Sequence, residues 1–276
     1  THHALLKYFL SGFTTPEYYR FASGDDHLED NAIFRFASSI FSNPQTFHKN
    51  TINIAQRLYE VTLLPTIRSG ELFIALFSDI HVEDSTIRAI GIFKSESKES
   101  YLKLNTASNT FKIKTDTGIS IGKLDKGCLI LNVEKEQGFK VLAVDALSKS
   151  EAQFWINDFL MIANRTDSYF RTRNFLDLTR QYVDDQMDQQ FQVSKADKID
   201  LLNRSMNFFK SKDRFDQHEF EEEVLEDPSV IESFRSYERN FGRNDTDAAD
   251  SFEISAQAVK RQSRVFKSVL KLDKNF

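Results

Sequence analysis

The stretch from Glu71 to Asp145 most constrains the fold, because only there are alternating, β-branched and aromatic residues dense. Two pairs of short apolar runs have the length of strands: 72–77 with 89–93, and 128–133 with 139–144. We expect hairpin connections at 78–85 and 134–138, with Gly138 free to adopt the positive φ of a tight turn. The runs predict an antiparallel sheet whose first pair is buried on both faces and whose second pair is more mixed.

Two further runs, Tyr101–Leu104 and Phe111–Lys114, alternate cleanly and predict strands with one face in water. Helical sequence flanks the sheet, from 4 to 63 before it and from 150 to 241 after it. Capping-box patterns at Ser150 and Ser194 predict two of the later helix starts. The predicted fold class is therefore α+β, with a central antiparallel sheet between N-terminal helices and a C-terminal helical block.

The last part of the chain predicts a basic helix–strand unit. Residues 252–262 have helical spacing, and 265–276 alternate as a strand would. The predicted domains are an α+β domain at 1–149, a helical domain at 150–241 and the basic unit at 251–276. The chain starts without Met and stops inside an apolar alternating segment, so we expect this unit to be truncated.

Composition narrows the classes of partner. The net charge of −5 gives no overall attraction to nucleic acid, so such binding needs a local patch. We find no apolar run near the ~20 residues of a membrane span and no leader pattern, and we expect no membrane partner. The single cysteine, Cys128, excludes an internal disulfide framework and fits the cytoplasm.

The final twenty residues supply such a patch, with one acid, Asp273, among six cations. The candidate nucleic-acid-binding residues are Lys260, Arg261, Arg264, Lys267, Lys271 and Lys274. Cations on one face of a helix–strand unit release counterions from DNA when they contact phosphates. Lysines also protect exposed edge strands from aggregation, and residue types alone leave both interpretations open.

Candidate catalytic groups are weaker. Asp79 and Glu96-Ser97-Lys98 follow the order of a magnesium-dependent nuclease, but the second motif lies in a Ser-rich loop. The acids between Asp25 and Asp30 are explained by a loop before a helix N-terminus. Cys128 enters a strand and is interpreted as a buried structural thiol. We therefore predict no catalytic residue, no metal site and no cofactor.

Four stretches carry a resemblance to a known family: 124–130, 152–160, 195–203 and above all 252–276. They resemble the bacterial 37-kDa nucleoid-associated protein family, in the form found in Bacteroidetes-like sequences. The likeness keeps a consistent order over most of the chain. It implies a cytoplasmic protein of the nucleoid that associates with double-stranded DNA, and it carries no catalytic motif across.

The function inferred is non-enzymatic, sequence-tolerant association with double-stranded DNA through phosphate contacts. An alternative is a protein–protein adaptor that binds a DNA-metabolic partner through its acidic or Phe-rich helices. A magnesium-dependent nuclease is the third hypothesis. A protein partner or a homo-oligomer remains open at this point.

Overall fold

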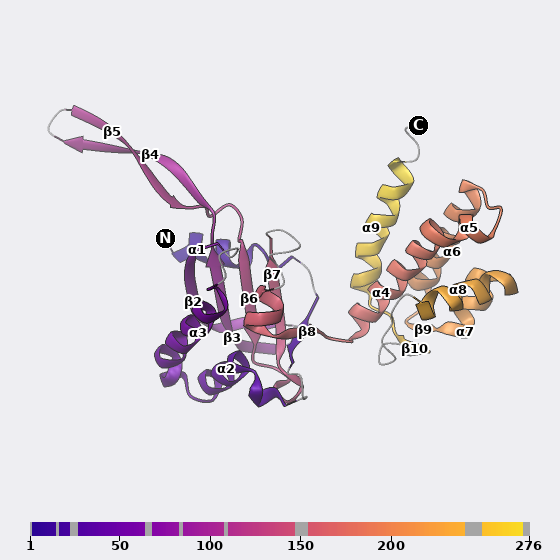
Figure 1. The fold of residues 1–276 in the computed structure, drawn as a ribbon, viewed down its shortest axis with the longest axis horizontal. Helices are drawn as coiled ribbons and strands as arrows, with labels where there is room; N and C mark the ends of the chain where they lie inside the picture. The colour runs from indigo at the N-terminus through magenta and orange to yellow at the C-terminus, as the bar shows by residue number, and fades with distance from the viewer. Residues whose placement is uncertain are drawn as a thin grey trace. The chain divides into compact units, whose positions relative to one another are not determined.

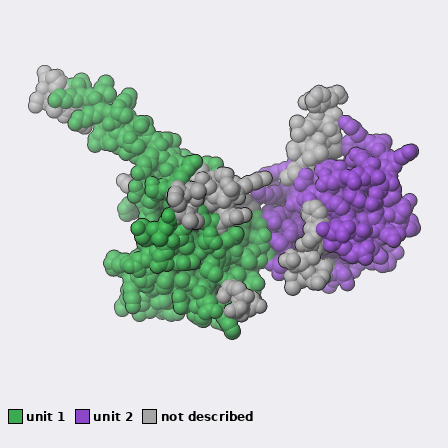
Figure 2. Space-filling model, viewed as in Figure 1, with its two compact units in different colours: residues 1–165 green, residues 166–276 purple. Residues whose placement is uncertain are grey.

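A computed structural model describes residues 2–14, 17–22, 27–63, 68–82, 85–107, 110–146, 154–240 and 250–272, with the backbone alone at 105–107, 110 and 265–272. The chain forms two compact units, residues 1–165 and residues 166–276 (Figure 2). The first unit is built around a sheet and the second is mostly helical (Figure 1). The α+β fold class is confirmed, whereas the three-part domain division remains a prediction.

The first unit holds a six-stranded antiparallel sheet of order β2-β3-β6-β7-β1-β8. Its strands are β1 (Tyr19–Phe21), β2 (Glu71–Val82), β3 (Ser85–Ser95), β6 (Lys126–Leu131), β7 (Lys140–Asp145) and β8 (Ile162–Asn164). The four longer strands coincide with the four predicted runs. The short strands β1 and β8 were not predicted, because three residues are too few to show a period of two.

Burial differs among these strands. All of β6 is buried, as is β3 from Ala89 to Ser95, whereas β2 is half-buried because it lies at the sheet edge. The expected burial of both faces therefore holds for β3 but not for β2. Gly138 ends a 3₁₀ turn with φ of 90°, which confirms the second predicted connection. The first connection was drawn too long, since β2 continues to Val82 past a register shift after Phe77.

Helices pack on both faces of the sheet. Strand β3 alternates, placing Ile92 in one core cluster and Phe93 in another. The first cluster joins the sheet to α2 (Ala32–Ser42), α3 (Phe47–Val61) and a π-helix at Phe154–Leu160, and the second joins it to α1 (His2–Leu10). Phe9 of α1 stacks on Phe93 at 4.3 Å between ring centroids.

The starts of α2 and α3 follow from their sequence. The side chain of Asn31 accepts a hydrogen bond from the amide of Phe34, which caps α2. Asn43 caps a 3₁₀ turn at Pro44–Thr46 that leads into α3, and this confirms the predicted Asn-Pro helix start. The capping box predicted at Ser150 lies outside the described residues.

Two buried ion pairs lie side by side in the first unit. Lys94 and Lys126 are cross-strand partners and are almost fully buried. The ammonium of Lys94 donates to Glu96 at 2.5 Å, and that of Lys126 donates to Asp145 at 2.9 Å. The ring of Phe154 lies 5.5 Å and 5.2 Å from the two ammonium groups. Each like charge is thus neutralised by its own acid and shares one aromatic ring.

Strands β4 (Lys98–Ala107) and β5 (Thr110–Ile119) form a separate two-stranded sheet, called the ribbon here. It extends away from the six-stranded sheet (Figure 1). The two strands are confirmed, but the expectation that only one face lies in water is wrong. The apolar side chains stay exposed as well: Leu102 70%, Leu104 65%, Phe111 76% and Ile113 66%.

A buried carboxylate holds the root of the ribbon. Asp125 is 3% exposed and accepts three hydrogen bonds from the two residues that precede β4. The amides of Glu96 and Ser97 donate at 2.7 Å and 2.8 Å, and the Ser97 hydroxyl donates at 2.7 Å. Burial alone would raise the pKa of Asp125, but the bonds from Ser97 and Glu96, with the charge of Lys126, lower it below its usual value.

The second unit packs helices around phenylalanines. Its elements are α4 (Ser168–Gln181), a π-turn (Tyr182–Gln186), α5 (Met187–Gln190), α6 (Lys195–Ser211), β9 (Arg214–Asp216), α7 (Gln217–Phe220), a π-turn (Glu221–Leu225), α8 (Pro228–Asn240), β10 (Ser251–Glu253) and α9 (Ala256–Leu272). The capping box at Ser194 is confirmed. The core contains Phe175, Phe208, Phe209, Phe215, Phe220, Phe234 and Phe252. These seven are part of the chain's 26 phenylalanines.

The strand predicted at 265–276 is wrong over 265–272, and its last four residues lie outside the described residues. Phe252 lies in β10, paired with Phe215 of β9, and α9 then runs without a break to Leu272. Alternation from Val265 suggested a strand, yet no Gly or Pro separates it from the helix that precedes it. A helix already nucleated and packed continues at the cost of one residue at a time, so it overrides a weak local preference.

Candidate nucleic-acid interface

Helix α9 exposes three described cations, Lys260, Arg261 and Arg264, beside its buried face. Ala258, Val259 and Gln262 are buried, and the helix contacts α4 and α6. The side chains of Lys260, Arg261 and Arg264 are exposed. This split follows from helical geometry, in which residues three or four apart share a face. The buried face fixes the helix and leaves the side chains of Lys260 and Arg264 exposed to solvent.

The helix changes how the predicted site residues are grouped. Positions 260, 264, 267 and 271 recur at intervals of four, three and four, which is the spacing of one helical face. A strand would have divided them differently. The side chains of Lys267 and Lys271 and the whole of Lys274 lie outside the described residues. The structure therefore places the side chains of Lys260, Arg261 and Arg264 only.

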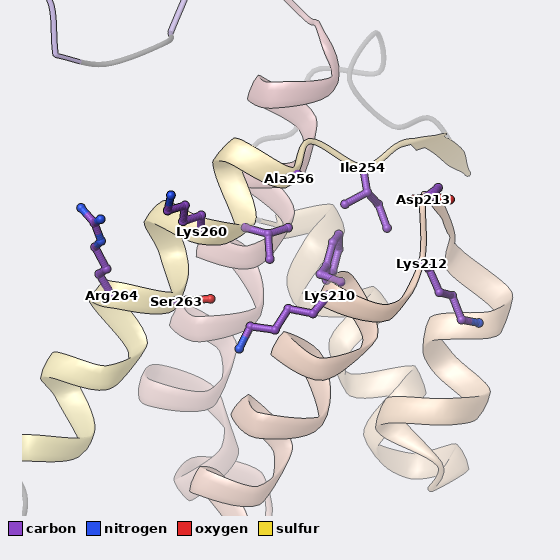
Figure 3. A pocket seen from close by; sticks show the side chains of 10 residues that line it. Lys210, Lys212, Asp213, Ile254, Ala256, Lys260, Ser263 and Arg264 are labelled. Atoms are coloured by element: carbon purple, nitrogen blue, oxygen red, sulfur yellow. The ribbon is translucent and has the colours of Figure 1, made fainter.

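A groove of about 490 Å³ runs between α6 and α9 and is called the α6–α9 groove. Its lining residues are Phe209, Lys210, Lys212, Asp213, Ile254, Ala256, Val259, Lys260, Ser263 and Arg264. Figure 3 shows Lys210 on α6 and Lys260 and Arg264 on α9. The apolar members come from both helices and from the end of β10. The groove thus combines an apolar lining with cations from two helices.

The cations of this groove differ in their partners. Lys212 donates to Glu219 at 2.7 Å and to Glu223 at 2.6 Å, and these bonds raise its pKa. Its charge is already neutralised within the protein. Within the described part of the chain, Lys210, Lys260 and Arg264 have no carboxylate at ion-pair distance. The groove contains one acid among its lining residues, Asp213.

Lys210 was missed in the sequence. It stands in the last turn of α6, 50 residues before the first predicted cation. A lysine near a helix C-terminus has an ordinary explanation in the helix dipole, so nothing in the sequence singles it out. The antiparallel pairing of β9 with β10 brings the end of α6 beside the start of α9.

Other charged residues are used inside the protein. Arg165 donates to Glu134 and to Gln137, and Arg180 pairs with Asp177 and Asp184 at 3.7 Å each. In the acidic stretch 213–226, Glu221 is buried and accepts both hydrogen bonds of Arg235. Glu219, Glu223 and Glu226 of the same stretch are exposed and form ion pairs with Lys212 or Arg204.

The nuclease motif is not assembled. Asp79 is exposed near the end of β2, whereas Glu96 follows β3 at the opposite end of the β2–β3 ladder. Glu96 is buried against Lys94, and Lys98 pairs with Glu71 at 3.4 Å. Asp79 is therefore separated from the other two groups, and Glu96 and Lys98 already have ion-pair partners.

The remaining chemical candidates are also accounted for. Cys128 is fully buried, and burial raises the pKa of its thiol, so it is a structural side chain. Among the residues that the structure describes, no group of three His, Cys, Asp or Glu side chains is placed to hold a metal ion. Asp25 and Asp26 lie outside those residues. In the same residues no helix combines the length and apolarity needed to cross a membrane.

Comparison with known proteins agrees with the sequence resemblance. The model of a family described as nucleoid-associated protein YejK matches residues 1–276, the whole of the sequence. Neither the curated proteins nor the solved structures give a match. The resemblance is confirmed over its full length, and the chain belongs to this family of nucleoid-associated proteins.

Proposed function

We propose that this protein associates with double-stranded DNA through phosphate contacts made by the cations of the α6–α9 groove and α9. Membership in the family implies DNA association and a place in the cytoplasm, at the nucleoid. The observation that carries the proposal is that Lys210, Lys260 and Arg264 are exposed on neighbouring helices and form no ion pair with any described residue. A DNA phosphate would provide the anionic partner for these cations.

The proposed association is sequence-tolerant and non-enzymatic. Phosphate contacts position a protein on a duplex but carry no sequence information of their own. Lysine and arginine side chains at the rim of the α6–α9 groove can contact the phosphate backbone of DNA without entering the DNA grooves in which bases are read. The separation of Asp79 from Glu96 and Lys98 supports a role without catalysis.

The test is a salt series of DNA binding with the full chain. Each phosphate contact contributes about −0.9 to the slope of log K against log salt, so three contacts give a slope near −2.7. Contacts from Lys267, Lys271 or Lys274 would steepen the slope. Random-sequence and genomic duplexes of equal length should bind alike. A flat salt response with measurable affinity would contradict the electrostatic account.

A pair of charge reversals locates the surface. Lys260→Glu with Arg264→Glu should weaken binding at least about 10-fold at low salt and leave the melting temperature unchanged, since both side chains are exposed. The matched control, Lys195→Glu with Arg239→Glu, reverses two exposed cations elsewhere in the second unit. Equal losses in both variants would show that net charge, not α9, governs binding.

One observation favours a second candidate function. The α6–α9 groove is lined by Ile254 and Val259 as well as by cations, and apolar walls suit a protein side chain better than a phosphate. An adaptor that binds an acidic segment with an apolar anchor would use both features. If the wild-type chain gives no salt-sensitive retardation of DNA, this function replaces the first.

A further inference from the structure

The register of the ribbon sorts its side chains onto two different faces. Lys103 and Lys114 are direct cross-strand partners, and Lys112 lies two residues from Lys114 on the same strand. Residues that are paired directly or lie two apart share a face, so all three lysines lie on one side. Leu102, Leu104, Phe111 and Ile113 fall on the other side by the same rule. The ribbon therefore has a lysine face and an apolar face.

The lysine face lacks anionic partners among the described residues. All three side chains are exposed, and among the described residues none has a carboxylate at ion-pair distance. Like charges placed directly opposite each other destabilise a strand pair. Asp116 and Glu99 lie on this face nearer the root, where the Glu99 carboxylate accepts a hydrogen bond from Ser120. The outer part of the face thus gathers cations at a cost that an anionic partner would relieve.

The root of the ribbon holds this face in place. The three hydrogen bonds accepted by Asp125 fix the chain where β4 begins, and the amide of Ser120 donates to the carbonyl of Ser97 across the base at 3.0 Å. Strands of ten residues extend for about 30 Å, at about 3.3 Å per residue. The lysines are therefore presented away from the sheet on a support anchored at one end.

We propose that the lysine face of the ribbon is a second DNA-contacting surface, which binds backbone phosphates through Lys103, Lys112 and Lys114. The proposal rests on the function proposed above and adds a separate element in the other unit. Duplex DNA is a polyanion, and its major groove is wide enough to admit a two-stranded ribbon. The lysine face of a second copy would be repelled here, because it carries the same positive charge.

The apolar face points to a competing arrangement that the experiment can reveal. Two copies could bury Leu104 and Ile113 against each other, and the lysines would then serve only to keep the other face soluble. In that arrangement DNA affinity would not depend on the lysines, whereas the oligomeric state would depend on the apolar residues.

The experiment compares two triple variants of the full chain in the same salt series. Lys103→Gln with Lys112→Gln and Lys114→Gln removes the lysine face. Lys49→Gln with Lys123→Gln and Lys135→Gln removes three exposed lysines elsewhere on the first unit. The ribbon variant should bind DNA at least about 10-fold more weakly at low salt and lose about 0.9 from the slope for each contact removed. The control should keep the wild-type slope.

The outcomes separate this inference from the function on which it rests. If the wild type and the ribbon variant bind DNA alike while the α9 reversals weaken binding, the ribbon inference is wrong and the proposed function stands. If Leu104→Ser with Ile113→Ser also converts an oligomer to a monomer in sedimentation, the ribbon is a self-association arm instead. If the wild type does not bind DNA at all, both proposals fail together.

Discussion

Helix α9 and the ribbon both expose cations, but they are supported in opposite ways. Helix α9 buries Ala258, Val259 and Gln262 against neighbouring helices, and its cations occupy what remains. The ribbon has no such buried face, because Leu104 and Ile113 are about two-thirds exposed. It is held at its root by Asp125. One surface depends on a core beneath it, and the other depends on a local anchor.

This difference indicates which substitutions should disrupt each surface. A change in the phenylalanine core of the second unit should disturb α9 through the loss of its support. A change along the ribbon should alter only what the ribbon contacts, because little of the fold packs on it. Isolated two-stranded sheets are only marginally stable by themselves, which makes the anchor at Asp125 more important than any single ribbon side chain.

The largest effect should come from replacing a phenylalanine by alanine in the core that supports α9, and the same replacement on the ribbon gives the comparison. Phe215 is 1% exposed and stacks on Phe209 and Phe252, with ring centroids at 5.4 Å and 4.6 Å. Phe215→Ala should lower the free energy of unfolding by about 3–5 kcal/mol, because it leaves a cavity in the core. Phe111→Ala, at 76% exposure, should change it by less than about 0.5 kcal/mol. Urea denaturation measures both.

A large destabilisation by Phe111→Ala would break the comparison. It would mean that the apolar face of the ribbon is covered in solution, and a concentration-dependent melting temperature would identify a second copy as the cover.

A smaller effect is expected at the anchor, and it should depend on pH. Asp125→Ala leaves three donors without their acceptor and should cost about 2–3 kcal/mol at neutral pH. The folded-state pKa of Asp125 is lowered, so its contribution is present above the unfolded pKa of about 3.9 and is lost as the pH falls through the folded value. The difference between variant and wild type should therefore shrink below about pH 4.

Asp116 supplies the matched control, since it is an exposed acid on the ribbon. Asp116→Ala should cost less than about 0.5 kcal/mol, because its side chain is exposed. Urea denaturation at neutral and acidic pH tests both variants. An Asp125→Ala deficit that persists undiminished in acid would show that its carboxylate is not the anchoring group.

The smallest effect concerns two lysines of the α6–α9 groove. Lys212 already donates to Glu219 and Glu223, so Lys212→Gln should leave DNA affinity within about 2-fold of wild type. Lys210→Gln should lower the affinity and reduce the salt slope by about 0.9, because that charge is free to contact phosphate. The same gel-shift series compares them. Equal losses would show that charge near the groove matters and pairing does not.

Much of the fold could be predicted from local pattern. The four long strands, the Asn-Pro start of α3 and the capping box at Ser194 each carry a signal within a few residues. Strands β1 and β8 could not be found, because three residues joined to the sheet by distant partners have no period of their own. The open apolar face of the ribbon was also missed, since alternation indicates which side chains share a face but not whether anything covers it.

The candidate site was predicted in part. Lys260, Arg261 and Arg264 were named from local charge, and the structure places all three on the exposed side of α9. The strand assigned from Val265 was wrong because the alternation competes with a helix already packed at Val259. Lys210 comes close to the cations of α9 because β9 pairs with β10, and this long-range pairing has no signal in the nearby sequence. Whether these cations bind DNA remains a prediction.

The side-by-side ion pairs of the first unit have a consequence for how this family can change over evolutionary time. Losing Glu96 alone would leave the buried ammonium of Lys94 without its counter-charge, and losing Asp145 alone would do the same to Lys126. Each cation and its acid should therefore be kept or lost together, because a sequence with only one of them contains a buried charge without its counter-charge. Related sequences should keep both members of a pair or replace both with apolar residues.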